Sequence, residues 1–194
     1  MKKYEFTGET KRVELWNRTA TLHRIKATVE FGFVKVGELG GWIEKEENLS
    51  HEGKAWVCGD AKVCGDAKVW GNAKVCGDAK VWGNAEVCGD AKVCGDAKVW
   101  GNAKVWGNAE VCGDAKVFLA SHVLVMGSVG SRNDFTTFFR DKDNEITVKC
   151  GCFLGKIDKF LEKVTQTHGN NKYALVYRAA VEVAKLQIEL TERK

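Results

Sequence analysis

A six-residue repeat that begins at position 55 limits what this chain can fold into more than any other feature. The units read AWVCGD, AKVCGD, AKVWGN, AKVCGD, AKVWGN, AEVCGD, AKVCGD, AKVWGN, AKVWGN, AEVCGD and AKVFLA, and the pattern then decays towards position 129. Ala and Val alternate with Lys and with Cys or Trp, which is the period of a strand with one buried face. The Gly-Asp or Gly-Asn pair tolerates a positive φ and predicts a sharp bend. The repeat therefore predicts a parallel β-solenoid in which three four-residue strands and three two-residue corners make each coil.

The predicted coils stack so that each strand pairs with the strand 18 residues later, at about 4.8 Å. About four coils then enclose a uniform interior, in which only alanine fits near the corners and valine fills the centre. One coil cannot bury this surface by itself, so the solenoid is stable only as a stack with covered ends. The valines predicted to point inward are Val57, Val63, Val69, Val75, Val81, Val87, Val93, Val99, Val105, Val111 and Val117.

Each valine is followed four positions later by a small residue, as in Val63 with Ala67 and Val69 with Ala73. In this spacing the segment 55–129 resembles the hexapeptide-repeat left-handed β-helix family, which includes trimeric acyltransferases. The resemblance implies a mainly β protein, a left-handed solenoid and a homo-oligomer, either a trimer or a dimer. The chain departs from the family at the residue after the aliphatic one, which is usually small and here is Cys or Trp.

Residues 1–54, before the repeat, are predicted to form a β-rich N-terminal cap. The stretch GELGGWIEKEENLSHEG supplies Leu39, Ile43 and Leu49, which can cover the first coil. The ends GGWIEKEENLS and CGCFLGKIDKF, with a later HGNNKY, are similar to those of uncharacterised bacterial and prophage proteins that carry hexapeptide repeats. This resemblance implies a bacterial or prophage source.

Residues 130–194, after the repeat, are predicted to form a small α+β unit of one β-hairpin and two helices. FTTFFR and EITVKCGCF read as strands on either side of a turn at 141–144. Apolar residues then recur at helical spacing over 157–167 and from 173 to about 190. This unit can hold a core of its own or dock on the last coil.

The composition of the chain predicts a cytoplasmic protein without a membrane partner. No apolar run approaches the roughly 18 residues of a membrane helix, and no apolar signal segment follows the first residues. The net charge of +4 is mild and argues neither for nor against a nucleic acid partner. Six of the eight cysteines belong to the repeat, so we expect free thiols in a reducing cytoplasm rather than a disulfide framework.

A coil of 18 residues sorts the exposed side chains of the repeat into three columns. The first column holds Cys58, Cys76, Cys94 and Cys112. The second column holds Lys62, Lys80, Lys98 and Lys116 beside Cys64, Trp82, Trp100 and Phe118. The third column mixes Lys68, Glu86, Lys104 and His122 with Trp70, Cys88, Trp106 and Leu124.

The cysteine column has two interpretations. Thiolates about 4.8 Å apart can converge on a soft metal ion such as zinc or copper(I), which makes Cys58, Cys76, Cys94 and Cys112 candidate ligands. In every intact unit, however, Cys is followed by Gly-Asp and Trp by Gly-Asn. Duplication of whole units produces this linkage without any role in metal binding, so inert surface thiols are the favoured reading. No cofactor is predicted.

The column of lysines and aromatic rings is the better candidate for a functional surface. Its predicted site residues are Lys80, Trp82, Lys98, Trp100, Lys116 and Phe118. Aromatic faces can stack on bases and ammonium groups can neutralise phosphate, which suits a nucleotide, a nucleic acid or a small anionic ligand. Exposed aromatic rows are also typical of a subunit interface, which is the favoured interpretation because related β-helices commonly form trimers, and they can simply stabilise neighbouring strands.

Two function classes remain open. The favoured hypothesis is a non-enzymatic structural or interaction protein, which presents its side-chain rows for self-assembly or for a host or phage partner. The alternative is an acyltransferase of the hexapeptide class, whose site would lie between subunits near His122. His122 is the one histidine of the repeat region, and we expect it at an exposed strand position. Binding of acetyl-CoA distinguishes the two hypotheses, since only the enzyme requires it.

Overall fold

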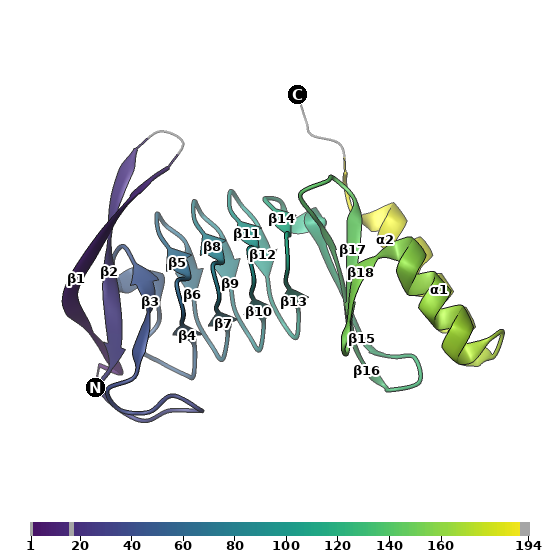
Figure 1. Ribbon diagram of the computed structural model, residues 1–194, viewed down its shortest axis with the longest axis horizontal. Helices are drawn as coiled ribbons and strands as arrows, with labels where there is room; N and C mark the ends of the chain where they lie inside the picture. Colours follow the sequence, from purple (N-terminus) through teal and green to yellow (C-terminus); the bar gives the residue numbers. More distant parts are fainter. Residues whose placement is uncertain (1, 16–17, 191–194) are drawn as a thin grey trace.

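The repeat forms a parallel β-solenoid of about four turns, as predicted, in a mainly β chain (Figure 1). The computed structural model describes residues 2–15 and 18–190. Strands recur every six residues, and each is two residues long, shorter than the four residues predicted. In chain order they are β4 (Trp56–Val57), β5 (Lys62–Val63), β6 (Lys68–Val69), β7 (Lys74–Val75), β8 (Lys80–Val81), β9 (Glu86–Val87), β10 (Lys92–Val93), β11 (Lys98–Val99), β12 (Lys104–Val105), β13 (Glu110–Val111) and β14 (Lys116–Val117).

Residues 18 apart lie opposite each other in three stacks of strands, which form the three faces of the solenoid. The lysine face contains β5, β8, β11 and β14, and there Lys98 pairs with Lys80 and Lys116. The thiol face contains β4, β7, β10 and β13, which carry the cysteine column. The mixed face contains β6, β9 and β12. The three predicted columns therefore exist, except for the last members of the third.

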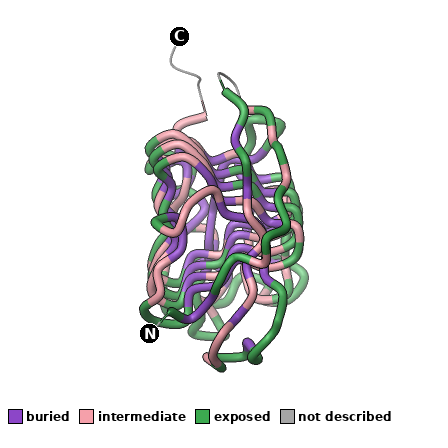
Figure 2. Tube along the Cα trace, turned by 90° about the vertical axis from the view of Figure 1, so that its left-hand side faces the viewer, coloured by how far each residue is buried: buried purple, intermediate pink, exposed green. Residues whose placement is uncertain are grey.

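The interior is the predicted one. Every valine from Val57 to Val117 at the repeat position is at most 1% exposed, and the repeat alanines are fully buried. Figure 2, a view along the stack, shows buried residues at the same place in successive coils. Glycine is required at the corners: Gly89 has a φ of +71°, and a Cβ there would lie 2.9 Å from the backbone nitrogen of Gly107 in the next coil.

The N-terminal end adds a coil that does not carry the repeat. Strands β1 (Tyr4–Glu14) and β2 (Thr19–Ala27) are antiparallel, and β2 pairs with β3 (Leu39–Ile43), which runs parallel to β5. A short 3-10 helix, η1 (Glu46–Asn48), follows.

Two of the three residues predicted to cover the first coil do so. Ile43 and Leu49 are fully buried in the solenoid core. Leu39 is 48% exposed, so its predicted role is wrong. Its neighbour Gly40 takes the inward place, where a Cβ would lie 2.5 Å from a side-chain carbon of Ile25, and strand alternation turns Leu39 outward.

The C-terminal end closes the other side of the stack with a separate sheet and two helices (Figure 1). The 3-10 helix η2 (Ala120–His122) leaves the last coil, so the decaying part of the repeat joins this sheet. Its antiparallel strands are β15 (Val123–Val129), β16 (Asp134–Arg140), β17 (Ile146–Cys150) and β18 (Phe153–Lys156), followed by α1 (Ile157–His168) and α2 (Lys172–Gln187). The predicted hairpin is β16 with β17, and both predicted helices are present.

The C-terminal sheet is a middle layer between the solenoid and the helices. In β16 the fully buried Phe139 belongs to the solenoid core, whereas its neighbour Phe138 belongs to the core under α1 and α2. The alternation of a strand thus covers the last coil with one face and holds the helices with the other. Among residues 2–15 and 18–190, no helix has both the length and the apolar character needed to cross a membrane.

Candidate functional site

A groove with a volume of about 750 Å³ runs along the lysine face. The structure brings all six predicted site residues together on its floor: Lys80, Trp82, Lys98, Trp100, Lys116 and Phe118. One wall comes from the end of β1, with Val13, Glu14 and Leu15. The other wall comes from the turn between β16 and β17, with Arg140, Lys142, Asp143 and Asn144.

The wall residues could not be found from the sequence, because nothing local marks them. They belong to segments far from the repeat, and only the placement of the two ends of the stack brings them to this face. Lys142, for example, is anchored to the solenoid by an ion pair of 2.6 Å with Asp114. The floor, in contrast, follows directly from the 18-residue coil.

The aromatic rings of the floor stack on one another. The ring centroids of Trp82 and Trp100 are 5.0 Å apart at an interplanar angle of 4°, and those of Trp100 and Phe118 are 5.0 Å apart at 32°. The guanidinium carbon of Arg140 lies 5.0 Å from the Phe118 centroid at one end, and Trp82 packs at the other end against the buried cluster that contains Cys64. The ring faces that could stack on bases are therefore occupied by neighbouring side chains.

The three floor lysines Lys80, Lys98 and Lys116 differ from Lys62 of the same row in their ion pairing. Lys62, at the start of the row, donates to Asp60 at 2.6 Å. In the part of the chain that the structure describes, Lys80, Lys98 and Lys116 form no ion pair with any carboxylate. Like charges placed directly opposite in neighbouring strands repel each other, at about 4.8 Å between strands. This face therefore carries an uncompensated row of positive charge.

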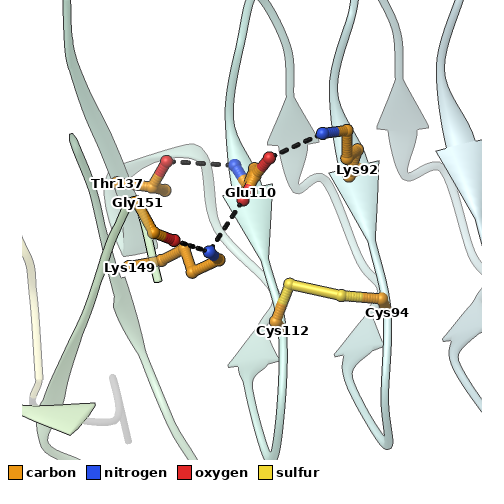
Figure 3. The surroundings of a disulfide bond; sticks show 7 residues. All are labelled: Lys92, Cys94, Glu110, Cys112, Thr137, Lys149 and Gly151. Atoms are coloured by element: carbon orange, nitrogen blue, oxygen red, sulfur yellow. Dashed lines mark hydrogen bonds and ion pairs between the residues drawn. A yellow bond between two sulfur atoms is a disulfide. The ribbon is translucent and has the colours of Figure 1, made fainter. Parts of the chain in front are cut away.

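Each of the other two faces compensates one of its lysines, while Lys68 and Lys74 form no ion pair among the described residues. On the mixed face, Lys104 lies 3.6 Å from the carboxylate of Glu86. On the thiol face, Glu110 pairs with Lys92 at 2.7 Å and with Lys149 of β17 at 3.2 Å (Figure 3). The two AEVCGD units place their glutamates in these two columns and leave none for the lysine face. The positions of these two units in the repeat therefore predict which face has no glutamate.

The cysteine column contains a disulfide bond between Cys94 and Cys112, whose Cα atoms are 4.7 Å apart (Figure 3). The expectation that all repeat cysteines are free thiols is wrong for this pair. The reason is the register, because residues 18 apart lie opposite each other at a Cα separation that a disulfide can span. Among the described residues no group of three or more His, Cys, Asp or Glu side chains is arranged to hold a metal ion.

His122 does not occupy the exposed strand position that was predicted. It ends the 3-10 helix η2 and is fully buried. Its Nδ1 accepts a hydrogen bond from the backbone N–H of Phe118 at 3.3 Å, and its buried Nε2 has no hydrogen-bond partner among the residues that the structure describes. Burial, with a smaller contribution from the positive charge of Arg140, lowers the pKa of His122 to about 4. A buried imidazole without access to a ligand is poorly placed to act as a general base.

No protein-family model matches the chain, and a search of curated proteins finds none that is similar to it. The resemblance to hexapeptide-repeat proteins therefore stays a prediction from the repeat.

Proposed function

We propose that this chain is a non-enzymatic binding protein whose groove on the lysine face takes an acidic segment of a partner protein. One observation carries the proposal: within residues 2–15 and 18–190, Lys80, Lys98 and Lys116 form a row without an ion-paired carboxylate, on the floor of a walled groove. Bringing carboxylates to this row would relieve the repulsion between the ammonium groups. The free protein thus holds unfavourable charge that a bound anion would compensate.

The aromatic column supports an anion rather than a base as the ligand. An aromatic ring is negative on its face and positive at its edge. Because Trp82 and Trp100 stack face to face along the column, their faces are not available for a base to stack on. Single-stranded nucleic acids depend on such faces for sequence-tolerant binding. Carboxylates, in contrast, need only the ammonium groups and the positive ring edges.

The test is a binding experiment with a fluorescently labelled oligo-glutamate peptide, followed by anisotropy at low and at physiological salt. We expect binding that weakens with salt. The double variant Lys80→Gln with Lys98→Gln should weaken it by about tenfold or more, which corresponds to about 1.4 kcal/mol. The matched control is Lys68→Gln with Lys104→Gln, which removes the same charge from the mixed face and should change affinity by less than about twofold.

Three results would overturn the proposal. The first is the absence of peptide binding at low salt. The second is an equal loss of affinity in the two double variants, which would mean that only net charge matters. The third is tighter binding of oligothymidylate of equal charge, which would make a nucleic acid the ligand.

Self-assembly through α2 is a second candidate function, favoured by a separate observation. One side of α2 exposes large apolar residues to solvent: Leu175, Val176, Val183 and Leu186. Leu186 is 89% exposed. Several large apolar side chains exposed on one side of a helix are typical of a protein contact surface. Light scattering should show an oligomer that Leu175→Glu with Leu186→Glu converts to a monomer. A monomeric wild-type protein would contradict this candidate.

The identity of the solenoid as a left-handed hexapeptide-repeat helix belongs to the same proposal. The six-residue spacing of strands β4 to β14 and the alanine and valine interior support it. An experimental structure that shows right-handed coils would contradict it. The bacterial or prophage source and the cytoplasmic location stay predictions from the sequence.

A further inference from the structure

The four cysteines of the thiol face form an evenly spaced column along the stack. Cys94 and Cys112 are joined by a disulfide bond. Strands β7 and β10 are paired in the same register, which places Cys76 opposite Cys94, and strands β4 and β7 place Cys58 opposite Cys76. The backbone hydrogen bonds repeat as well, with N–H to carbonyl distances of 2.9 Å from Cys76 to Val93 and 3.0 Å from Cys94 to Val111. Every neighbouring pair therefore has the backbone geometry of the bonded pair.

The free half of the column is chemically prepared for nucleophilic attack. Cys58 and Cys76 are half-buried free thiols. A hydrogen bond from the Cys58 thiol lowers the pKa of Cys76, burial opposes this, and the positive charges of Lys74 and Lys92 lower it further, to about 6. Cys76 is then a thiolate at neutral pH, and the thiolate is the attacking species in disulfide exchange.

We propose that the thiol face is an internal thiol–disulfide exchange ladder, in which the disulfide moves between Cys94–Cys112 and Cys76–Cys94. The Sγ thiolate of Cys76 attacks the Sγ of Cys94. The new bond between Cys76 and Cys94 forms as the bond between Cys94 and Cys112 breaks, and Cys112 leaves as a thiolate with the electron pair. The number of disulfides is unchanged, so no external oxidant or reductant takes part.

The architecture favours this step because the three sulfur atoms belong to one column. The disulfide lies along the stack (Figure 3), and Cys76 follows on the Cys94 side in the next coil. The attacking thiolate therefore approaches roughly in line with the bond that breaks. The exchange requires no change of strand pairing, since both disulfides join residues 18 apart in equivalent register.

Two other cysteines of the solenoid lie outside the cysteine column, and Cys88 serves as the matched control. Cys88, on the mixed face, has Trp70 and Trp106 at the equivalent positions of the neighbouring coils. Cys64, on the lysine face, is followed by Trp82 in the next coil. Neither has a cysteine neighbour in its column, so neither can take part in exchange along the stack.

The experiment maps disulfides after equilibration at pH 7.5, acid quenching and trapping of free thiols with a maleimide at low pH. Cleavage before aspartate separates the relevant cysteines, because Cys76 falls in 66–77, Cys94 in 90–95 and Cys112 in 96–113. The peptides 60–65 and 90–95 are both DAKVCG, so the Cys64→Ser chain is used throughout. Tryptic digestion is unsuitable, since 63–68, 75–80 and 93–98 are all VCGDAK.

We expect both linked peptide pairs, 66–77 with 90–95 and 90–95 with 96–113, the first in at least about a tenth of the chains. Cys76→Ser should remove the first pair and leave only Cys94–Cys112. Cys112→Ser with Cys58→Ser, oxidised with glutathione disulfide, should contain only Cys76–Cys94, because Cys58 could otherwise compete for Cys76. Cys88→Ser should match the Cys64→Ser parent. Absence of the Cys76–Cys94 pair from both the parent and the chain with Cys112→Ser and Cys58→Ser would overturn the proposal, as would any linked pair that contains Cys88.

Discussion

The lysine face and the thiol face are built from the same six-residue unit, yet their chemistry differs. Both rest on identical rows of buried valine and alanine. On the thiol face the last strand carries Glu110, which forms an ion pair with Lys92. On the lysine face the last strand carries Lys116 at the equivalent position. One residue per unit therefore decides whether a column is compensated or charged, while the interior keeps the fold unchanged.

The residue after each valine makes the second difference between the faces. Where two aromatic residues are 18 apart, as Trp82 and Trp100 are, their rings stack. Where two cysteines are 18 apart, as Cys94 and Cys112 are, they can bond. The function of a solenoid residue thus depends less on its own identity than on that of its neighbours in the adjacent coils.

The largest expected effect concerns acid, and it should separate the two faces. His122 ends the aromatic column of the lysine face, with its ring 4.3 Å from that of Phe118. Its folded pKa of about 4 lies below the unfolded value of about 6.5, so below pH 6.5 the unfolded chain binds a proton that the folded chain does not. The free energy of unfolding should therefore fall by on the order of 3 kcal/mol between pH 6.5 and 4, and level off below.

Urea unfolding at pH 7 and pH 4.5 measures this fall. His122→Gln should remove most of it. The pKa of His51 is also lowered by burial, and its contribution stays in both chains, so the difference between them isolates His122. An equal fall in the two chains would show that His122 is protonated without cost in the folded state.

The next effect tests whether the two faces share one interior. Val93 lies behind the thiol face and Val99 behind the lysine face, and both are fully buried. Replacing either by alanine removes two methyl groups and leaves a cavity, which should cost about 2 kcal/mol in each case. Urea unfolding at pH 7 measures both. A difference of more than about 1 kcal/mol between the variants would mean that the outer columns alter the packing of the core.

A smaller effect concerns the ion pairs of the thiol face. Burial raises the pKa of Glu110, but hydrogen bonds from Lys92 and Lys149 outweigh it, so the folded pKa is lowered. Glu110→Gln should cost about 1 kcal/mol at pH 7. The lowered pKa contributes its full stability above the unfolded pKa, about 4.3, and this contribution is lost as pH falls from there through the folded pKa, so the cost should disappear over that range. A cost that persists in strong acid would point to packing instead of charge.

The solenoid was predictable because its interior repeats without exception, and a period of six leaves few alternatives. The coil around β3 is not predictable as a coil, since Gly40, Ile43 and Leu49 replace the alanine and valine rows there. Its pairing with β5 depends on the shape of the first repeated coil, which no local pattern in that segment reports.

The floor of the groove was predictable for the same reason, and its chemistry only in part. Positions 18 apart fixed the row of lysines and rings, but the stacking of Trp82 on Trp100 depends on side-chain rotation, which the repeat does not determine. The burial of His122 depends on η2, where the chain leaves the solenoid. A repeat predicts only the positions that follow its period, so it does not predict the surroundings of a residue such as His122, where the period ends.

The smallest expected effect on stability is the most direct comparison of the faces. Lys98→Glu places a carboxylate between Lys80 and Lys116, which should relieve repulsion and stabilise the free protein by about 0.5 kcal/mol. The same variant should weaken oligo-glutamate binding by more than about tenfold, because a fixed carboxylate then occupies the place of the ligand. Lys104→Glu on the mixed face should destabilise, since it faces Glu86. Urea unfolding and peptide anisotropy measure both properties. If Lys98→Glu destabilises as much as Lys104→Glu, the lysine row is already compensated in the free protein, and charge does not explain the groove.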